Sequence, residues 1–554
     1  MKGRHGRDSY YIVGEGMRTF AGDGTSLLTQ AKSIQEMTEF RFSRFFVDLK
    51  GNPNSTNLLA KLAVAMSDTS GKSDSTIPAG YTYLGQFVDH DLTLDKSELN
   101  LEFPQSIPGL ASARSPTLDL DSLYGLMPHE SPKWYVDGIK LRTGRPRSVE
   151  SPNAAQDGMD LPRWGDEVGG HLGTAREARI PDTRNDENLA IAQLHAAFIR
   201  FHNKVVDTLA LQGTPSSLLF DKAREIATKH YQWMLIHDYL PRVVDKDIVE
   251  DVFNGKRRFF EISENNDATM PVEFSGAAFR LGHSMIRTGY NWNKFFNAKE
   301  AEAQGPIRSG HIHRLMRFSG TSGVLFPSSA EPGSDEDLRG LERPAVGEVG
   351  DVLPSNWVAD FTRLFDLTSF GNEFKAPAGD FNFAMKIDTS IVEPMKRLPL
   401  GSFGGTGEPD LALERSLGFR NLIRGRMLAL PSGQQLAERM NIKPLSIDEL
   451  LNGAGGIVLT DDFLSGDKDE MTENTPLWFY ILREAETRGG NKLTGVGGTI
   501  TVETFHRAIE ASHNSILADP GFTPFLGGTQ GRFDMGDLLH FAFDGRADLL
   551  NPHR

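Results

Sequence analysis

The chain has 554 residues, 39% of them hydrophobic, which is enough to bury a large core. Its formal net charge of -15 argues against nucleic acid or an anionic membrane as the main partner, because both attract clustered Lys and Arg. The absence of cysteine excludes disulfides, thiolate metal sites and cysteine nucleophiles.

The N-terminal sequence is basic, and no apolar stretch follows it. We therefore expect no secretory signal, which leaves a cytoplasmic location or export by a non-classical route open. No apolar run approaches the length needed to span a bilayer. We expect an N-terminal arm over residues 1–25 and a single domain over residues 26–554.

Helical periodicity dominates the chain from about Leu189 onward, and strand signals are few and short. This pattern predicts a mainly α fold with long ordered loops. Thr214 and Pro215 form a helix-start signal, and Ser446 with Glu449 forms a capping box. The predicted helices cover residues 188–211, 214–240, 357–365, 411–426, 477–486 and 502–516.

The first chemically notable motif is GQFVDHD, residues 85–91, in which two carboxylates flank His90 and Gln86 lies one turn before it. An adjacent carboxylate can raise the pKa of a histidine and fix its tautomer. The motif alone is equally compatible with a polar helix end at the surface.

Oxygen-bearing side chains alternate with leucines in SPTLDLD, residues 115–121. In an extended chain alternate side chains share a face, so a row of hard oxygen ligands suitable for calcium results. A solvated strand edge is the alternative interpretation of this pattern by itself. The residues on that face are Ser115, Thr117, Asp119 and Asp121.

Arg184 and Glu187 lie three residues apart at a predicted helix start, so both can project toward one site. His195 and His202 follow two turns apart on the same helix. They could be metal ligands, but we favour packed or hydrogen-bonded structural residues.

His283 stands between two small residues, Gly282 and Ser284, in FRLGHS. Small neighbours would let a flat group approach the imidazole closely. A lone core histidine is the alternative for this motif in isolation.

The order of these four motifs resembles the animal-type haem peroxidase superfamily, and the absence of cysteine favours a bacterial-type member. Later segments are similar in the same order, namely YQWMLIHDYLP at 231–241, NLIRGR at 421–426 and TPLWFYILREAE at 475–486. The resemblance spans roughly residues 80–510 and implies the predominantly α-helical fold of that superfamily.

The resemblance implies that His90 is the distal base, Arg184 the distal arginine and Gln86 a residue of the distal water or halide site. It also implies ester links from Asp89 and Glu187 to the haem. A link through a methionine is not expected, because Asn188 stands at that position.

On the opposite side of the haem, the resemblance makes His283 the iron ligand and Asn421 the partner of its other ring nitrogen. Arg280 and Arg424 match positions that meet the haem propionates. The chain departs from the family pattern after Arg426, where it continues MLALP. The matched calcium ligands are Asp91, Ser115, Thr117, Asp119 and Asp121.

The implied function is reduction of hydrogen peroxide through a ferryl intermediate, with oxidation of halides, thiocyanate or phenols. A fatty-acid oxygenase and a non-catalytic, calcium-stabilised adhesion protein remain alternatives. The oxygenase branch needs a tyrosine three residues before the iron-binding histidine, and Arg280 stands there. The oligomeric state stays open.

Overall fold

The computed structural model describes residues 9–12, 16–20, 26–29 and 42–553, apart from 94–114, 126–127, 129–131, 165–176, 256, 261–268, 305–307, 318–351 and 399–414. Helices make up most of the regular structure in these residues, and the strands are short. This confirms the predicted mainly α fold. The proposed boundary between arm and domain stays a prediction.

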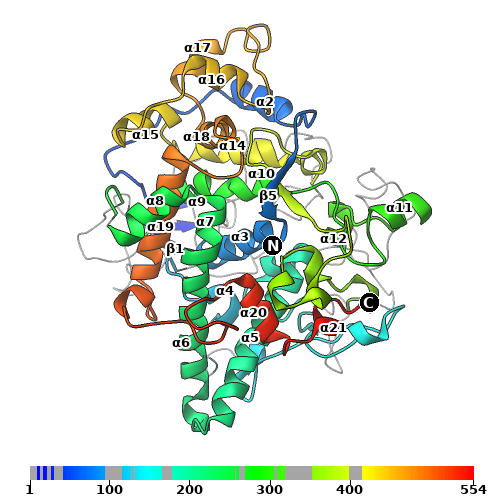
Figure 1. The fold of residues 1–554 in the computed structure, drawn as a ribbon. Helices are drawn as coiled ribbons and strands as arrows, with labels where there is room; N and C mark the ends of the chain where they lie inside the picture. The colour runs from blue at the N-terminus through cyan, green and yellow to red at the C-terminus, as the bar shows by residue number, and fades with distance from the viewer. Residues whose placement is uncertain are drawn as a thin grey trace.

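Two long helices form an antiparallel pair that extends downward in Figure 1: α5 (Leu189–Leu211) and α6 (Ser216–Met234). The first half of α5 is buried on all sides, as expected for a helix without a polar face. The helix α3 (Gly80–Leu92) packs on α5, where Phe87 stacks on Phe198 with ring centroids 4.3 Å apart. This contact fixes α3 near the centre of the molecule.

The remaining helices surround this centre (Figure 1). They are α2 (Thr56–Ala65), α4 (Asp121–Tyr124), α7 (Leu240–Val243), α8 (Lys246–Asn254), α9 (Val272–Gly276), α10 (Gly282–Met285), α11 (Ala298–Gln304), α12 (Ile312–Arg317), α14 (Leu417–Met427), α15 (Gly433–Arg439), α16 (Ile447–Asn452), α17 (Lys468–Glu473), α18 (Leu477–Thr487), α19 (Gly495–Glu510), α20 (Met535–Ala542) and α21 (Ala547–Leu550). In the described part of the chain, no helix combines the length and apolar character needed to cross a membrane.

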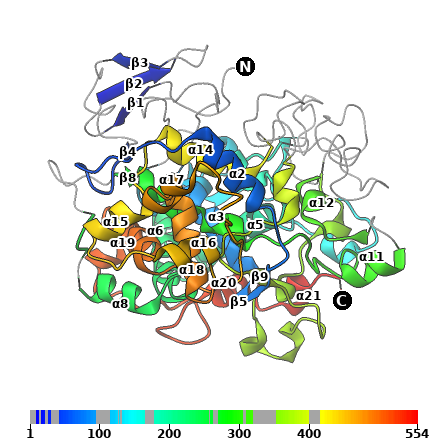
Figure 2. The same cartoon turned by 90° about the horizontal axis from the view of Figure 1, so that it is seen from above.

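The largest sheet has the strand order β3-β2-β1-β4-β8 and lies at one edge of the helical body (Figure 2). Two parallel pairings, β1 with β4 and β4 with β8, join an antiparallel meander to the body. Two further sheets have two strands each. The strands are β1 (Ser9–Ile12), β2 (Gly16–Phe20), β3 (Ser26–Thr29), β4 (Phe42–Ser43), β5 (Asp74–Pro78), β6 (Tyr135–Val136), β7 (Lys140–Leu141), β8 (Met270–Pro271) and β9 (Phe383–Met385).

Several predicted helices are confirmed, namely α5, α18 and the capped α16, in which Ser446 and Glu449 bond reciprocally. The predicted helix 411–426 appears as α14 from Leu417, and residues 411–414 lie outside the described residues. The predicted helix 502–516 begins earlier, as α19 at Gly495. The earlier start is stabilised by Glu484, which accepts hydrogen bonds from two backbone N–H groups of the first turn.

Two predictions were wrong in detail. Thr214 does not cap α6; Pro215 is the N-cap, while the Thr214 N–H bonds back to Leu209. The helix predicted over 357–365 is absent from that segment, which forms two separate 3-10 turns. Side chains bind its backbone instead, because Asn293 donates to two carbonyls there and Asp360 accepts from Thr362.

Candidate active site

One wall of the candidate site is α3, which carries Gln86, Asp89 and His90. Residues three and four apart on a helix are neighbours, so these polar side chains lie near one another. The apolar residues of α3 are buried on its other faces. Packing therefore fixes the position of the polar group.

His90 has a defined hydrogen position. Its Nδ1 lies 2.7 Å from Oδ1 of Asn185. A carboxamide oxygen can only accept, so Nδ1 carries the hydrogen and Nε2 is the basic nitrogen. Nε2 lies 3.9 Å from Oε1 of Glu187, and the His90 side chain is only 6% exposed. His90 therefore presents a proton acceptor on the side lined by Glu187.

Arg184 is held beside His90 by several charge-assisted hydrogen bonds. Its Nε and Nη2 donate to the two carboxylate oxygens of Asp182 at 3.1 and 2.7 Å, and Nη2 also donates to the His90 carbonyl at 3.0 Å. The short 3-10 turn that carries Arg184 (Thr183–Asp186) is anchored through Asp186, which pairs with the buried Arg163 at 2.9 Å. The guanidinium has little freedom to move.

The two carboxyl groups near His90 are harder to ionise than usual. Burial raises the pKa of Asp89, and it raises the pKa of Glu187 to about 8 although Arg184 opposes the shift. Gln86 donates a hydrogen bond to Glu187 and accepts one from Asn188 at 3.3 Å. At neutral pH Glu187 is therefore mainly a neutral carboxylic acid in a polar network.

The opposite wall is built around His283 on α10. Nδ1 of His283 lies 2.6 Å from Nδ2 of Asn421 on α14. Burial, together with the charge of Arg280, lowers the pKa of His283 to about 3. The imidazole is therefore neutral at physiological pH, as a metal ligand must be.

Two arginines accompany His283. Arg280 donates from Nε to the Ser275 carbonyl at 2.8 Å and from Nη1 to Oδ1 of Asn421 at 3.4 Å. Arg424 is buried on α14, one turn after Asn421. This side of the site is therefore positively charged, which suits an anionic group.

The two walls face a common space. Burial is the largest cause of the shifted pKa values of Asp89, Glu187 and His283. Part of the surface of each of these residues is nevertheless open. The charge of Arg280 also acts on Asp89 across the site. A Cβ added at Gly282 would meet no atom within 4 Å. The half-buried residues are Gln86, Asp89, Arg184, Glu187, Arg280, Gly282 and His283.

These residues fit a haem. A neutral imidazole can bind its iron, open space beside Gly282 admits a flat ring system, and arginines can meet its carboxylates. No group of three or more His, Asp or Glu side chains arranged for a metal ion occurs among the described residues.

The segment predicted to bind calcium forms a loop and turn against α3. Ser115 Oγ lies 2.7 Å from Thr117 Oγ1 and donates to Asp121 at 2.5 Å. Asp91 accepts hydrogen bonds from the backbone N–H groups of residues 120 and 122. Asp119 instead accepts from Ser512 at 2.6 Å. All five predicted ligands thus lie in or against one loop, but the side chain of Asp119 bonds to Ser512.

Sequence reasoning missed Asp182 and Asn185, which orient Arg184 and His90. Both flank Arg184 in the sequence, so their nearness to the site was the available signal. His195 lies 2.8 Å from Asn185 through its Nδ1, and His202 contacts Tyr124 and the Ile139 carbonyl. Both histidines are hydrogen-bonded inside the protein, which is the interpretation we favoured over metal ligation.

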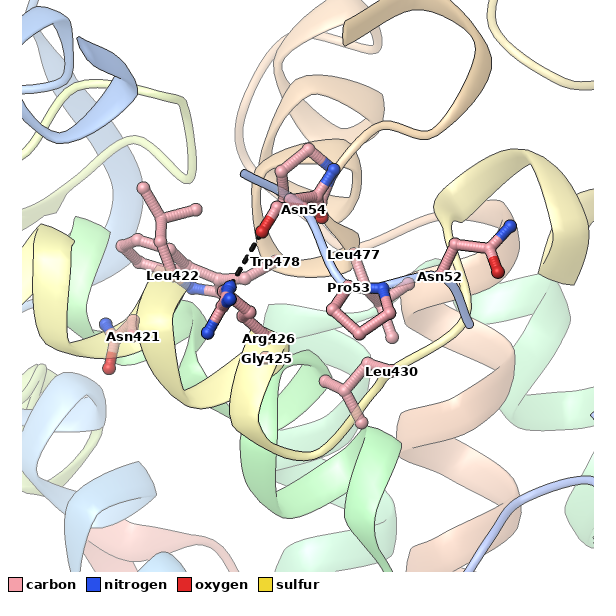
Figure 3. Close-up of a pocket in the computed structure, with 11 residues that line it drawn as sticks. Asn52, Pro53, Asn54, Asn421, Leu422, Gly425, Arg426, Leu430, Leu477 and Trp478 are labelled. Atoms are coloured by element: carbon pink, nitrogen blue, oxygen red, sulfur yellow. Dashed lines mark hydrogen bonds between the residues drawn. The ribbon is translucent and has the colours of Figure 1, made fainter. Parts of the chain in front are cut away.

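A small pocket lies beside Asn421, between α14 and residues 52–54 (Figure 3). Arg426 donates from Nε to the Asn54 carbonyl at 2.8 Å there. Arg426 therefore ties a loop to α14.

Comparisons with known proteins find similarity to one family. The family model described as animal haem peroxidase matches residues 109–341. Peroxidase mlt-7 of Caenorhabditis elegans is 34% identical over 195 residues, and human eosinophil peroxidase is 27% identical over 175 residues. These alignments cover 34% and 30% of this chain but only 24% and 22% of those proteins.

Solved structures share the fold over a greater length. Peroxidase A of Dictyostelium discoideum superposes with a TM-score of 0.52 at 15% identity, covering 86% of this chain and 88% of that one. Over residues 109–341 the chain is therefore similar to the animal haem peroxidase family, and over most of its length it shares the fold of Peroxidase A. A fatty acid alpha-dioxygenase of Oryza sativa also superposes with a TM-score of 0.52 at 15% identity, and the match covers 84% of this chain and 75% of that one. The match to the animal haem peroxidase family model implies haem as the prosthetic group.

Proposed function

We propose that this chain is a haem peroxidase, which reduces hydrogen peroxide and oxidises small molecules or halide ions. The observation that carries the proposal is the pairing of His90 and Arg184 on one wall with His283 on the other. His90 has its basic nitrogen available, and Arg184 is fixed by Asp182. These are the acid–base, charge and ligand roles that the reaction requires.

A bound haem would supply the iron that takes up the peroxide and accepts its oxidising equivalents. His283 would hold the iron through Nε2, and Arg280 and Arg424 would bind the propionates. Nε2 of His90 accepts one proton from hydrogen peroxide and returns it to the departing oxygen, so that water leaves. The Arg184 guanidinium stabilises the negative charge that develops on that oxygen.

A fatty-acid oxygenase is the second candidate, because the Oryza sativa alpha-dioxygenase shares the fold. The residue three positions before His283 argues against it. Arg280 stands there and is hydrogen-bonded to Ser275 and Asn421. A permanently charged guanidinium suits a propionate and cannot carry a tyrosyl-type radical.

We further propose ester links from Asp89 and Glu187 to the haem in part of the population. Both carboxyls are half-buried in the common space, and the raised pKa of Glu187 shows how poorly its ionised form is tolerated. Acid–acetone extraction followed by mass spectrometry tests this. Asp89→Asn and Glu187→Gln should each remove one link, and complete extraction of free haem from the parent protein would refute both.

We also propose one structural calcium ion held by Asp91, Ser115, Thr117, Asp119 and Asp121. Ser115 Oγ already lies 2.7 Å from Thr117 Oγ1 and 2.5 Å from a carboxylate oxygen of Asp121, which supports the proposal. Asp119 would have to release Ser512 to join them. Because Asp91 directly follows His90, such an ion would brace the distal histidine.

The decisive experiment compares two reactions of the haem-loaded protein. We expect peroxide-dependent oxidation of iodide, bromide, thiocyanate or a phenol, and no rapid oxygen uptake with polyunsaturated fatty acid. His90→Ala and Arg184→Ala should lower the rate constant for peroxide by about 10²- to 10⁴-fold. Arg308→Ala is the matched control, because Arg308 pairs with Glu150 elsewhere. Fatty-acid turnover, or turnover of neither kind, would favour the oxygenase or the binding-protein alternative.

A further inference from the structure

A chain of buried hydrogen bonds leads from the distal base into the core. His90 Nδ1 bonds to Oδ1 of Asn185, and Nδ2 of Asn185 lies 2.8 Å from Nδ1 of His195. Asn185 and His195 are fully buried, and His90 is 5% exposed. The chain joins three elements: α3, the turn Thr183–Asp186 and α5.

The hydrogen positions along this chain follow from chemistry. An amide nitrogen can only donate, so Nδ1 of His195 is the acceptor and its hydrogen lies on Nε2. The amide oxygen can only accept, so His90 must donate from Nδ1. Reversing the amide of Asn185 would place its nitrogen against His90 and move the His90 hydrogen to Nε2. His90 could then no longer accept a proton on that atom.

We propose that Asn185 and His195 are positioning residues that keep the hydrogen of His90 on Nδ1 and its Nε2 free to act as the base. The proposal rests on the proposed peroxidase function. With its own hydrogen on Nε2, His195 holds the Asn185 amide in this orientation, because its Nδ1 lone pair then accepts from the NH2 group in a fully buried setting, where an unpaired donor is costly. The oriented amide then selects the tautomer of His90.

An asparagine suits this role because it offers a donor to one histidine and an acceptor to the other, without charge. An aspartate would lose the donor. The ring of His195 also packs edge-on against Phe87, with centroids 5.8 Å apart. A phenylalanine at position 195 would keep this ring contact but could not accept a hydrogen bond from Asn185. The variant His195→Phe therefore separates the packing role from the hydrogen-bonding role.

The test measures the tautomer of His90 directly, by ¹⁵N NMR of histidine-labelled, haem-loaded protein in its diamagnetic ferrous carbon monoxide form. His90→Gln assigns the signal. In the parent protein we expect hydrogen on Nδ1. His195→Phe keeps the contact with Phe87 but removes the lone pair, so the His90 signal should become a mixture of tautomers. The rate constant for peroxide should fall by about 10- to 100-fold, within the range that acid–base groups contribute.

Two variants serve as controls. His202→Phe removes another buried imidazole from α5, one that bonds to Tyr124 and Ile139 and not to Asn185, so the His90 tautomer should not change. His195→Gln can offer an amide oxygen to Asn185 and should restore hydrogen on Nδ1.

Hydrogen on Nε2 of His90 in the parent protein, or an unchanged signal in His195→Phe, would overturn the proposal. The expected tautomers combined with no peroxide turnover in the parent protein would leave the hydrogen-bond chain standing and refute the peroxidase function.

Discussion

Arg280 donates a hydrogen bond to Oδ1 of Asn421 at 3.4 Å, while Nδ2 of the same amide faces Nδ1 of His283 at 2.6 Å. An amide nitrogen only donates, so His283 in this arrangement carries its hydrogen on Nε2. Binding iron through Nε2 requires the opposite tautomer. We therefore expect haem binding to turn the Asn421 amide over, so that its oxygen accepts from Nδ1, and to release Arg280 toward a propionate.

Asn421→Ala should weaken haem binding by about 10- to 100-fold, the usual effect of losing a group that orients a metal ligand. Asn421→Asp should bind haem at least as well as the parent, because a carboxylate accepts from Nδ1 in either orientation. Titration of haem-free protein, followed by absorption, measures both. Arg426→Ala on the same helix is the control, since Arg426 bonds to Asn54. Equal affinity of Asn421→Ala and the parent would contradict the role of this amide.

Calcium removal should lower both thermal stability and haem retention. A ligand present at 100 times its dissociation constant stabilises the folded state by about 2.7 kcal/mol. Metal analysis should find one calcium ion per chain in the parent protein and a reduced content in Asp121→Asn, which leaves the hydrogen bond to Ser115 possible. A calcium-free protein with unchanged melting temperature and haem spectrum would rule out the structural role.

The raised pKa of Glu187, about 8, predicts a pH-dependent stability of haem-free protein. Between about pH 4.5 and 8 the folded chain binds a proton that the unfolded chain does not, so this group lowers stability as pH rises. Glu187→Gln should therefore gain in melting temperature relative to the parent from pH 5 to pH 8.

Glu150→Gln is the matched control for this titration. Hydrogen bonding to Arg308 lowers the pKa of Glu150 to about 2, so its stabilising contribution is complete above about pH 4.5 and is lost only in acid. The effect of Glu150→Gln should be constant between pH 5 and 8. If the difference in melting temperature between Glu187→Gln and the parent is also constant from pH 5 to 8, the pKa of Glu187 is not raised in the folded protein.

A buried ion pair supports the segment next to His283. Lys72 donates to Asp388 at 2.6 Å and to Ser284 at 2.9 Å, and both charged side chains are almost completely buried. Lys72→Met leaves a buried charge unpaired and should cost about 3–5 kcal/mol in denaturant unfolding. Adding Asp388→Asn should recover part of this loss, because the amide oxygen can still accept from Ser390.

Lys246→Met, which breaks the exposed pair with Glu250, should change stability little by comparison. If the Lys72→Met and Asp388→Asn effects simply add, the two side chains are not coupled.

Local sequence signals predicted the helices whose ends are encoded within a few residues. Ser446 caps α16 as its capping box predicted, and Asn188, where the predicted helix 188–211 begins, is the cap of α5. The start of α19 could not, because Glu484, which stabilises it, lies eleven residues before Gly495 on another helix. The turns at 355–363 depend on Asn293, which no local pattern links to them.

The site residues divide in the same way, into those that local sequence indicates and those that depend on tertiary packing. Motif order identified His90, Arg184 and His283 as candidates, and the structure places the first two in contact. The orientation of His90 by Asn185, and that of Asn185 by His195, depends on how α5 packs against the turn before it. Hydrogen-bond direction of this kind is a property of tertiary structure.

The site draws on segments far apart in the chain, from His90 near its start to Asn421 on α14. During synthesis at about 5–20 residues per second, roughly 330 residues must be added after His90 before Asn421 exists, which takes on the order of half a minute. The distal residues are thus made long before the proximal wall is complete. If these residues hold haem as proposed, the haem can be bound from both sides only late in translation.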